Sequence, residues 1–356
     1  MTSFSRVSVA FHLDFSILVF DTYLYLIMQI AILTWGISAE RPVAQKSAMN
    51  MLEWIKTAWY IADMYDLPEE IDIFLGIYKK YDLVIPIFHG RYGEDGIITW
   101  MCETVGIPVA GCSSWVHALC IDKYHTNCVV EKLGVKIPKT WIPWLPHPMK
   151  LIPTENQKNL DTTLIIKPNQ GWSSLAMTKA TTLEEFRNGI KAVHDVIESL
   201  TWERMKLLST TDAKGYTRRF PLLRDVPMVQ ECIEGGEFTV WVYRDRWWTQ
   251  VLPIIEIITL KWDFFDYEEK YETDGSNEIF SDIEEWLKEM LESQSVQIYD
   301  FLGCRGVVRI DWRYDGKDIY FLEVNTIPGF SKVSLVPKMW KKAGKTEKEF
   351  IDMLMI

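Results

Sequence analysis

The sequence predicts a protein of the α/β class, with a parallel-sheet domain first and a mixed α+β part after it. Three observations predict this. The chain has 356 residues, which exceeds one typical domain and suggests two or three. In its first third, short apolar runs that read as buried strands alternate with stretches of helical periodicity, as in parallel α/β units. Further along, strand-like runs lie between two long amphipathic segments.

The N-terminal α/β domain is predicted at residues 28–113. Its strands are expected at 29–36 (QIAILTWG) and 81–88 (YDLVIPIF), which are apolar runs. Its helices are expected at 47–65, where apolar residues recur at helical spacing, and at 97–107. Because ligands of parallel sheets gather at the carboxyl ends of the strands, the loop after each strand is a candidate binding loop.

A central segment, residues 114–233, and a C-terminal segment, residues 234–356, are predicted to carry the α+β part. Helices are expected at 122–135, 183–200 and 281–303, and strands at 163–168, 227–233, 237–243 and 248–257. Residues 201–225 are expected to form a surface insertion without a chemical role.

The first 27 residues are apolar and rich in aromatic side chains. They do not form a convincing signal peptide, because Arg6 is their only basic residue and no small-residue cleavage site follows. Asp14 and Asp21 would be costly inside a bilayer, so no stable membrane span is expected. We interpret Met28 as the translation start and residues 1–27 as lying outside the fold. The alternative is an interfacial N-terminal helix.

Composition narrows the classes of function. With 38 basic and 49 acidic residues, the chain lacks the basic footprint of a protein that binds nucleic acid. Its six cysteines include no C-x-x-C pair. Scattered free thiols are typical of a reducing cytoplasm rather than of a disulfide framework.

Acidic and amide side chains near the C-terminal end form a candidate metal site. Glu323 and Asn325 alternate along a strand-like run and therefore point to the same face. Asp311 belongs to a second such run, VVRIDWRY, and pairing of the two runs would bring the three side chains together. Oxygen ligands of this kind suit Mg²⁺ that is bound jointly with substrate phosphates. An acid and an Asn two residues apart would by themselves indicate an ordinary solvated strand face.

The motifs of the chain resemble those of the ATP-grasp ligases and, among them, the D-alanine–D-alanine ligases. The resemblance runs from about Met28 to the C-terminus. It rests on IAILTWGISAERPV at 30–43, HGRYGEDG at 89–96, ALCIDK at 118–123, IIKPNQGWSS at 165–174, GEFTV at 236–240, FDYEEKY at 265–271 and EVNTIPGFSKVSL at 323–335. It implies an N-terminal α/β domain followed by the two-lobed ATP-grasp fold.

The resemblance also implies a reaction. ATP would phosphorylate the carboxylate of one D-alanine, and the amine of a second D-alanine would attack this D-alanyl phosphate to give D-alanyl-D-alanine for peptidoglycan. The implied cofactors are ATP and two Mg²⁺ ions, which Mn²⁺ can replace. The implied metal ligands are Asp311, Glu323 and Asn325. A cytoplasmic homodimer is implied as well.

The resemblance assigns nucleotide contacts to both lobes. Lys123 and Lys167 match two phosphate-contacting lysines, although an isolated lysine is usually a surface residue. Ser173 and Ser174 match a loop whose backbone N–H groups approach phosphate oxygens. Glu237 matches the carboxylate that accepts from the ribose hydroxyls. The other implied contacts are Gln230, where the family usually has Glu, together with Glu231, Ile233 and Lys270.

Substrate and catalytic roles follow from the same resemblance. Glu40 and His89 match the pocket of the first D-alanine, although His89 taken alone would more often be a structural histidine. Arg309 and the Gly329 N–H match the pair that stabilises the tetrahedral oxyanion. The remaining implied contacts are Ser334 and the Leu335 backbone for the second carboxylate, and Tyr271, which matches a lid tyrosine that bonds with Ser173 and Glu40.

The chain contains 16 tryptophans, several of them where the family has glycine. These are Trp35, Trp100, Trp172 and Trp262, with Trp241 as a weaker case. An inactive relative and a set of partner-binding tryptophans are two explanations. We favour a third, in which UGA codons that encode glycine have been read as tryptophan.

Three hypotheses about function remain open at this point. The leading one is an active D-alanine–D-alanine ligase. The second is another carboxylate–amine ligase of the same class, such as one that forms D-alanyl-D-lactate or D-alanyl-D-serine. The third is a catalytically silent ATP-binding relative. The intact set of motif residues argues against it, namely Glu40, Lys167, Arg309, Asp311, Glu323 and Asn325.

Overall fold

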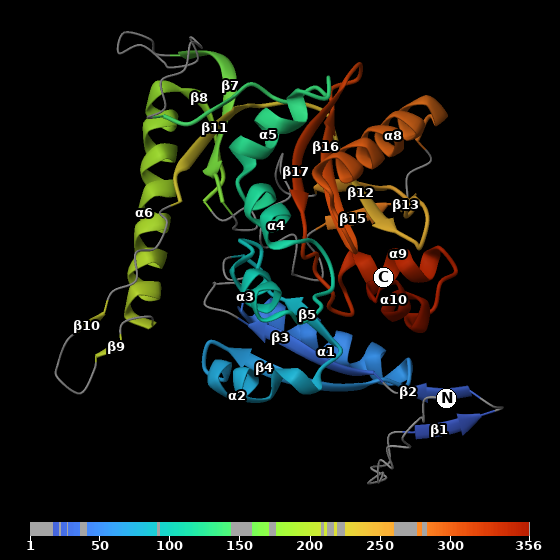
Figure 1. Cartoon of the computed structure of the whole chain (residues 1–356). Helices are drawn as coiled ribbons and strands as arrows, with labels where there is room; N and C mark the ends of the chain where they lie inside the picture. Colours follow the sequence, from blue (N-terminus) through green and yellow to red (C-terminus); the bar gives the residue numbers. More distant parts are fainter. Residues whose placement is uncertain are drawn as a thin grey trace, which may run out of the picture.

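The structure is a computed structural model of the whole chain. It describes residues 17–20, 23–26, 28–35, 41–90, 93–143, 159–170, 176–207, 210–211, 217–218, 225–259, 276–279 and 283–355. In Figure 1 a three-stranded sheet with its helices lies at one end of the molecule, and two antiparallel sheets lie side by side at the other. The mixed α/β class predicted from the sequence is confirmed.

The N-terminal unit is a parallel sheet of order β4-β3-β5, built from Gln29–Trp35 (β3), Ile61–Leu67 (β4) and Leu83–Ile87 (β5). Alternate residues of β3 enter two different apolar clusters, Ile30 and Ile32 on one face and Ala31 and Leu33 on the other. Because both faces are buried, the strand reads as a continuous apolar run. The helical elements of this unit are α1 (Arg41–Thr57), α2 (Ile71–Ile77), a 3₁₀ turn (Tyr78–Lys80) and α3 (Ile97–Val105). The next helix, α4 (Ser114–Ile121), buries Val116 and Cys120 in a different apolar cluster.

One sequence prediction in this unit is wrong. The single helix expected at 47–65 ends at Thr57, and Ile61–Leu67 forms β4, which pairs in parallel with β3. The break occurs at Trp59, whose φ of 67° lies in the left-handed region. The Trp59 N–H donates to the Lys56 carbonyl and the Tyr60 N–H donates to the Ile55 carbonyl. This is the Schellman pattern that terminates helices.

The central lobe is an antiparallel sheet of order β6-β11-β7-β8. Its strands are Thr140–Trp141 (β6), Asn159–Pro168 (β7), Thr178–Thr182 (β8) and Pro227–Glu231 (β11). The lobe also contains α5 (Lys123–Glu131), α6 (Leu183–Leu207) and two short paired strands, β9 (Thr210–Thr211) and β10 (Thr217–Arg218). Helix α6 continues to Leu207, so the expected end of this helix at residue 200 was wrong.

The C-terminal lobe is an antiparallel sheet of order β15-β14-β12-β16-β17, with β13 also paired to β12. Its strands are Gly236–Arg244 (β12), Thr249–Val251 (β13), Ile255–Thr259 (β14), Ser276–Ile279 (β15), Val307–Tyr314 (β16) and Ile319–Asn325 (β17). The run at 248–257 forms two strands rather than the one expected. Helix α8 (Glu285–Leu302) packs on one face, where Trp312 donates its indole N–H to Ser295.

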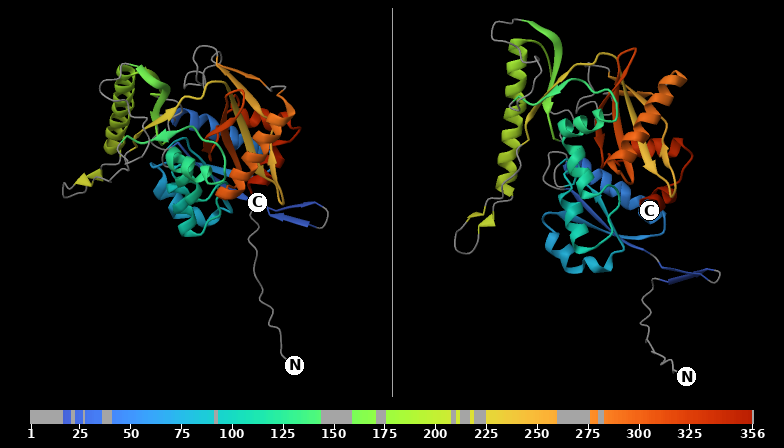
Figure 2. Two further views of the ribbon diagram at one scale, coloured as in Figure 1. Left: turned by 90° about the horizontal axis from the view of Figure 1, so that it is seen from above. Right: turned by 45° about the horizontal axis from the view of Figure 1, so that its top comes forward.

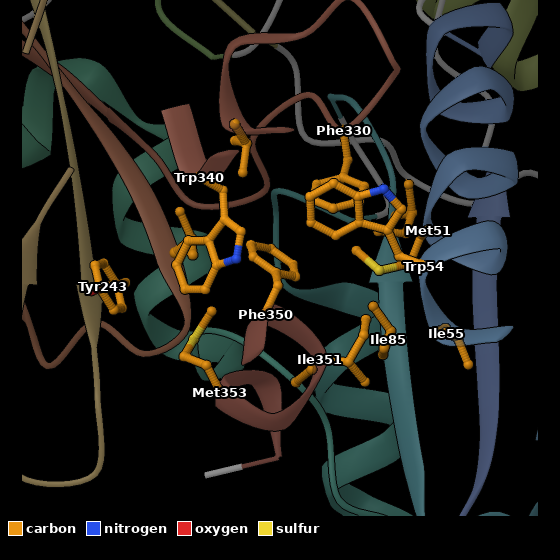
Figure 3. Close-up of a cluster of buried hydrophobic side chains, with 14 of the residues drawn as sticks. Met51, Trp54, Ile55, Ile85, Tyr243, Phe330, Trp340, Phe350, Ile351 and Met353 are labelled. Atoms are coloured by element: carbon orange, nitrogen blue, oxygen red, sulfur yellow. The ribbon is translucent and has the colours of Figure 1, made fainter. Parts of the chain in front are cut away.

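The first and last parts of the chain share one hydrophobic core. Helices α9 (Leu335–Lys342) and α10 (Glu347–Leu354) pack against α1 and the β3–β5 sheet, as Figure 3 shows for Trp54 of α1 and Phe350 of α10. The rings of Trp54 and Phe330 meet edge to face, with 4.7 Å between centroids. The C-terminal helices therefore lie between the N-terminal sheet and the C-terminal lobe (Figure 1).

The described residues near the start of the chain form a hairpin of Ile17–Phe20 (β1) and Tyr23–Leu26 (β2). Figure 2 shows this hairpin projecting from the N-terminal end of the molecule as a two-stranded sheet of its own. An interfacial helix over these residues is therefore wrong. Among the helices that the structure describes, none is both long enough and apolar enough to cross a bilayer.

Candidate active site

The predicted metal cluster forms where β16 pairs with β17. The antiparallel register places Asp311 opposite Glu323 and Arg309 opposite Asn325. The Asn325 amide nitrogen lies 3.2 Å from a carboxylate oxygen of Asp311 and 3.2 Å from one of Glu323. The juxtaposition expected from the alternation of residues is therefore present.

Asp311 is the most constrained member of this cluster. It is nearly buried, and it accepts hydrogen bonds from Thr239 at 2.7 Å and from two nitrogens of Arg309 at 2.9 Å. A carboxylate held by these hydrogen bonds keeps a fixed orientation. Arg309 also lies 3.8 Å from a Glu323 oxygen, so one guanidinium serves both acids.

Lys123 supplies a second cation. It is the first residue of α5, and its ammonium nitrogen lies 3.4 Å from a Glu323 oxygen. Burial alone lowers the pKa of Lys123, but the carboxylates of Glu323, Asp225 and Glu94 outweigh burial and raise the pKa above its usual value. The lysine is therefore protonated at neutral pH and suited to hold an anion.

The donor set fits a hard divalent cation that shares its coordination sphere with phosphates. Asp311, Glu323 and the Asn325 side chain offer oxygen atoms from two carboxylates and one amide. Among the described residues no group of three or more His, Cys, Asp and Glu side chains could hold a metal alone. Mg²⁺ is commonly bound by only a few protein ligands, with substrate oxygen atoms completing its coordination.

A pocket of about 560 Å³ lies beside this cluster. It is lined by Lys179, Cys232, Ile233, Glu234, Gly235, Gly236, Glu237, Glu256, Ile257, Ile258 and Arg313. Glu237 accepts from Arg313 at 2.8 Å, and the two residues are directly opposite in the β12–β16 register. The next same-face pair along these strands is Thr239 and Asp311. The pocket and the acid cluster therefore lie on one face of the sheet, two residues or about 7 Å apart.

The segment that holds the implied nucleotide contacts Gln230, Glu231 and Ile233 reaches this pocket only in part. Ile233 and Glu237 line the pocket, whereas the buried Gln230 side chain donates to Thr140 on β6 at 3.0 Å. Glu231 lies 3.5 Å from the Lys139 ammonium group. The structure therefore directs the side chain of Gln230 into the central lobe rather than toward the pocket.

Several hydrogen bonds hold Asn169 and Gln170, the residues with which the predicted phosphate loop begins. Asn169 accepts from the Lys123 and Tyr124 backbone N–H groups, and Gln170 donates its backbone N–H to Asp225. Lys167 lies two residues before this root, on β7 opposite Met228. The serines of the loop, Ser173 and Ser174, lie outside the described residues, as do Lys270 and Tyr271 of the predicted lid.

The predicted substrate residues gather around the segment after β17. His89, in the loop after β5, lies 3.3 Å from the Ser47 hydroxyl on α1. A side chain added at Gly329 would come within 3.1 Å of the Ser334 hydroxyl, so the two predicted contacts are neighbours. Ser334 is the N-cap of α9, which begins at Leu335, and such a position favours anions. Glu40 precedes α1 and lies outside the described residues.

Sequence reasoning missed four charged residues that line the pocket, Lys179, Glu234, Glu256 and Arg313. Arg313 lies two residues beyond Asp311 on the same strand, so strand alternation could have identified it. Lys179 and Glu256 come from other strands and carry no local motif.

The tryptophans fall into distinct environments. Trp54 and Trp312 are buried and packed against aromatic rings. Trp241 is buried beside Arg309, whose guanidinium carbon lies 5.9 Å from the ring centroid. Trp100 is 62% exposed within α3, and its helical backbone does not require glycine. Trp35 ends β3, whereas Trp172 and Trp262 lie outside the described residues.

Comparisons with known proteins agree with this geometry. Residues 222–356 match the family model described as the D-ala D-ala ligase C-terminus. A D-alanine–D-alanine ligase of Mannheimia succiniciproducens is 32% identical over 92% of this chain and 96% of its own length. A D-alanine–D-alanine ligase B of Clostridium tetani is 32% identical over 78% of this chain and 71% of its own length.

Solved structures give the same result for the fold. The VanG D-Ala:D-Ser ligase from Enterococcus faecalis superposes with a TM-score of 0.70 at 27% identity, covering 92% of this chain and 98% of its own. A D-alanine–D-alanine ligase from Bacillus anthracis complexed with ATP has a TM-score of 0.70 at 22% identity, covering 92% and 96%.

Proposed function

Since the chain belongs to the D-alanine–D-alanine ligase family of the ATP-grasp superfamily, we infer that it joins two D-alanine molecules at the expense of ATP. The observation that carries this inference is the pocket beside the acid cluster on one sheet face. A nucleotide seated in the pocket would extend its phosphates toward Asp311 and Glu323. The product dipeptide would serve peptidoglycan synthesis.

Residues of this chain would bind and orient the nucleotide. The Glu237 carboxylate, fixed by Arg313, is placed to accept hydrogen bonds from ribose hydroxyls. Lys123 and Lys167 would neutralise phosphate oxygens, and the raised pKa of Lys123 keeps that charge at neutral pH. Fixed cations near the transferring phosphoryl group act before the reaction begins and need no reorganisation.

We propose that Asp311, Glu323 and Asn325 hold Mg²⁺ together with the phosphates. The bound ion would draw charge from the phosphoryl oxygens while the anionic carboxylate approaches. The paired strands would present these oxygen atoms to the ion, and hydrogen bonds from Arg309 and Thr239 would prevent rotation of the Asp311 carboxylate.

The reaction proceeds in two steps, a phosphoryl transfer and an attack by an amine. A carboxylate oxygen of the first D-alanine bonds to the terminal phosphorus of ATP, and ADP leaves. The amine of the second D-alanine then bonds to the carbonyl carbon, phosphate leaves, and the amine loses a proton. Arg309 and the Gly329 N–H would stabilise the oxyanion, while Ser334 and the N-terminus of α9 would hold the second carboxylate.

The test measures ADP release by the purified protein with Mg²⁺ and candidate acceptors. We expect turnover with D-alanine and none with L-alanine. A second candidate is D-serine in the acceptor position, which the relation to a D-Ala:D-Ser ligase favours. A ratio of kcat/KM above one for D-serine over D-alanine would select that candidate, and ADP release without any amino acid would contradict both.

We also propose a homodimer in the cytoplasm, which rests on the family resemblance. Light scattering after size-exclusion chromatography tests the dimer, since the monomer has a mass of 41.6 kDa.

A further inference from the structure

The segment Thr326–Phe330 connects the metal cluster to the oxyanion site. It begins directly after Asn325 at the end of β17 and includes Gly329. Its interior is stiff, because Ile327 is buried and Pro328 has a fixed φ. The orientation of the Gly329 N–H therefore depends on how the two ends of this segment are held.

Helix α1 holds one end. Ser47 Oγ accepts the Phe330 N–H at 3.1 Å, and Asn50 donates its side-chain N–H to the Phe330 carbonyl at 2.9 Å. Trp54 packs its ring against the Phe330 ring (Figure 3). These three residues stand at i, i+3 and i+7 and therefore share one face of the helix. Both peptide planes that flank Phe330 are fixed from another part of the chain.

Helix α4 holds the other end. The fully buried His117 places Nδ1 2.6 Å from the Thr326 hydroxyl, one residue after Asn325. Its Nε2 has no hydrogen-bond partner among the described residues. Burying a polar ring is costly unless its nitrogen atoms form hydrogen bonds. The hydrogen bond between His117 and Thr326 offsets part of the cost of burying the ring.

We infer that Ser47, Asn50 and His117 are positioning residues, which hold the Thr326–Phe330 segment so that Asn325 and the Gly329 N–H keep their reactive placement. This inference rests on the proposed ligase function. None of the three lines the nucleotide pocket. Their loss should therefore slow the chemical step and leave nucleotide binding unchanged.

Ser47 also connects this segment to the predicted substrate pocket. Its hydroxyl has one hydrogen to donate and two lone pairs, so it can accept from Phe330 while bonding with His89 Nε2 at 3.3 Å. The Ser47 hydroxyl thus contacts both His89, in the predicted D-alanine pocket, and the segment that carries the oxyanion donor. Loss of Ser47 should raise the KM for D-alanine as well as lower kcat.

The experiment compares Ser47→Ala with Ser295→Ala. Ser295 is an equally buried serine on α8, where its hydroxyl accepts a hydrogen bond from Trp312. We expect Ser47→Ala to lower kcat about 10- to 100-fold with the KM for ATP unchanged, and Ser295→Ala to keep kcat within about 3-fold. Equal kcat in the two folded variants would overturn the inference.

The His117 end is tested by a pair of variants. His117→Ala removes the bond to Thr326, whereas the amide of His117→Asn occupies the place of Nδ1 and can restore it. We expect kcat to fall about 10-fold in the first and to recover in the second. If Ser47→Ala does not fold, Asn50→Ala replaces it, and unchanged kcat in both Asn50→Ala and His117→Ala would overturn the inference. Absence of D-alanine-dependent ADP release by the unaltered protein would contradict the ligase function instead.

Discussion

At the scale of single residues, the site depends on Asp311. Its carboxylate accepts from Thr239 and Arg309 and lies within 3.2 Å of the Asn325 amide. The sequence predicted this group, because alternation along two strand-like runs places the side chains on one face. It did not predict that Arg309 would lie against Asp311, since that contact depends on side-chain conformation within the folded sheet.

We expect Asp311→Asn to lower kcat at least 100-fold at ordinary Mg²⁺ concentration, because an amide keeps the shape but removes the charge. Asn325→Ala should act in the same direction, and raising Mg²⁺ should recover part of the activity. Thermal unfolding of both variants controls for loss of structure. Near-normal turnover of both variants at saturating Mg²⁺ would remove these residues from the metal site.

His117 should make stability depend on pH. Burial lowers its pKa to about 4, below the ordinary value of 6.5, so the folded chain keeps it neutral. Above pH 6.5 the His117 side chain is neutral in both the folded and the unfolded chain. Between pH 6.5 and 4 the unfolded chain binds a proton that the folded chain does not, so stability falls as pH falls. Urea unfolding of the unaltered protein and His117→Asn should diverge over this range, on the order of 3 kcal/mol at pH 4. Parallel pH profiles of the two proteins would refute the assignment.

At the scale of elements, the end of α1 shows where sequence patterns fail. Residues 47–65 keep apolar residues at helical spacing, yet the helix stops at Thr57. Helices α3 and α8 end in the same Schellman pattern, with Gly106 and Gly303 in the left-handed position. In α1 that position holds Trp59, which carries no terminating signal in the sequence.

We expect Trp59→Gly to raise the free energy of unfolding by about 1 kcal/mol, because glycine adopts positive φ without steric cost. The indole contributes little in return, since it is 84% exposed. Trp54→Gly, which empties a packed core position, should instead lower stability by about 3 to 5 kcal/mol. Urea unfolding distinguishes the two, and a destabilised Trp59→Gly variant would show that the indole contributes to the fold.

The backbone at Trp59 bears on the proposal that UGA codons were read as tryptophan. The codon at position 59 should be UGA, as should those of Trp35, Trp100, Trp172 and Trp262. The packed Trp54 and Trp312 should be encoded by UGG. The gene sequence decides this, and UGG codons at positions 35, 59, 100, 172 and 262 would contradict the proposal.

At the scale of the whole molecule, one hydrophobic core joins side chains from the first and the last of the segments expected from the sequence. Residues 28–113 were predicted as a separate domain, yet one face of their sheet shares a core with α9 and α10 (Figure 3). The order of elements and most motif residues were predictable from local patterns. The return of the last two helices to the first sheet was not, because amphipathic helices do not specify which surface they cover.

We expect residues 28–113 expressed alone to lack a cooperative unfolding transition. Without α9 and α10 the fragment would expose the apolar face formed by Ile30, Ile32, Met51, Trp54 and Ile55. Circular dichroism during urea titration, with the full chain as control, measures this. A sharp transition in the fragment would show that its own core suffices.

The β16–β17 pairing limits which changes in chain length the gene can accept. The strands are joined by a tight turn, in which Asp315 accepts from the backbone N–H groups of Lys317 and Asp318. Pairing shifts by one residue between Asp311 and Trp312, because Glu323 lies opposite Asp311 whereas Phe321 lies opposite Trp312, and side chains of β17 alternate only on either side of this shift. Loss of one codon in this turn would move Glu323 and Asn325 by one place along β16, away from their positions opposite Asp311 and Arg309. We expect deletion of Lys317 to abolish activity, whereas Lys317→Ala, which keeps the length, should be tolerated.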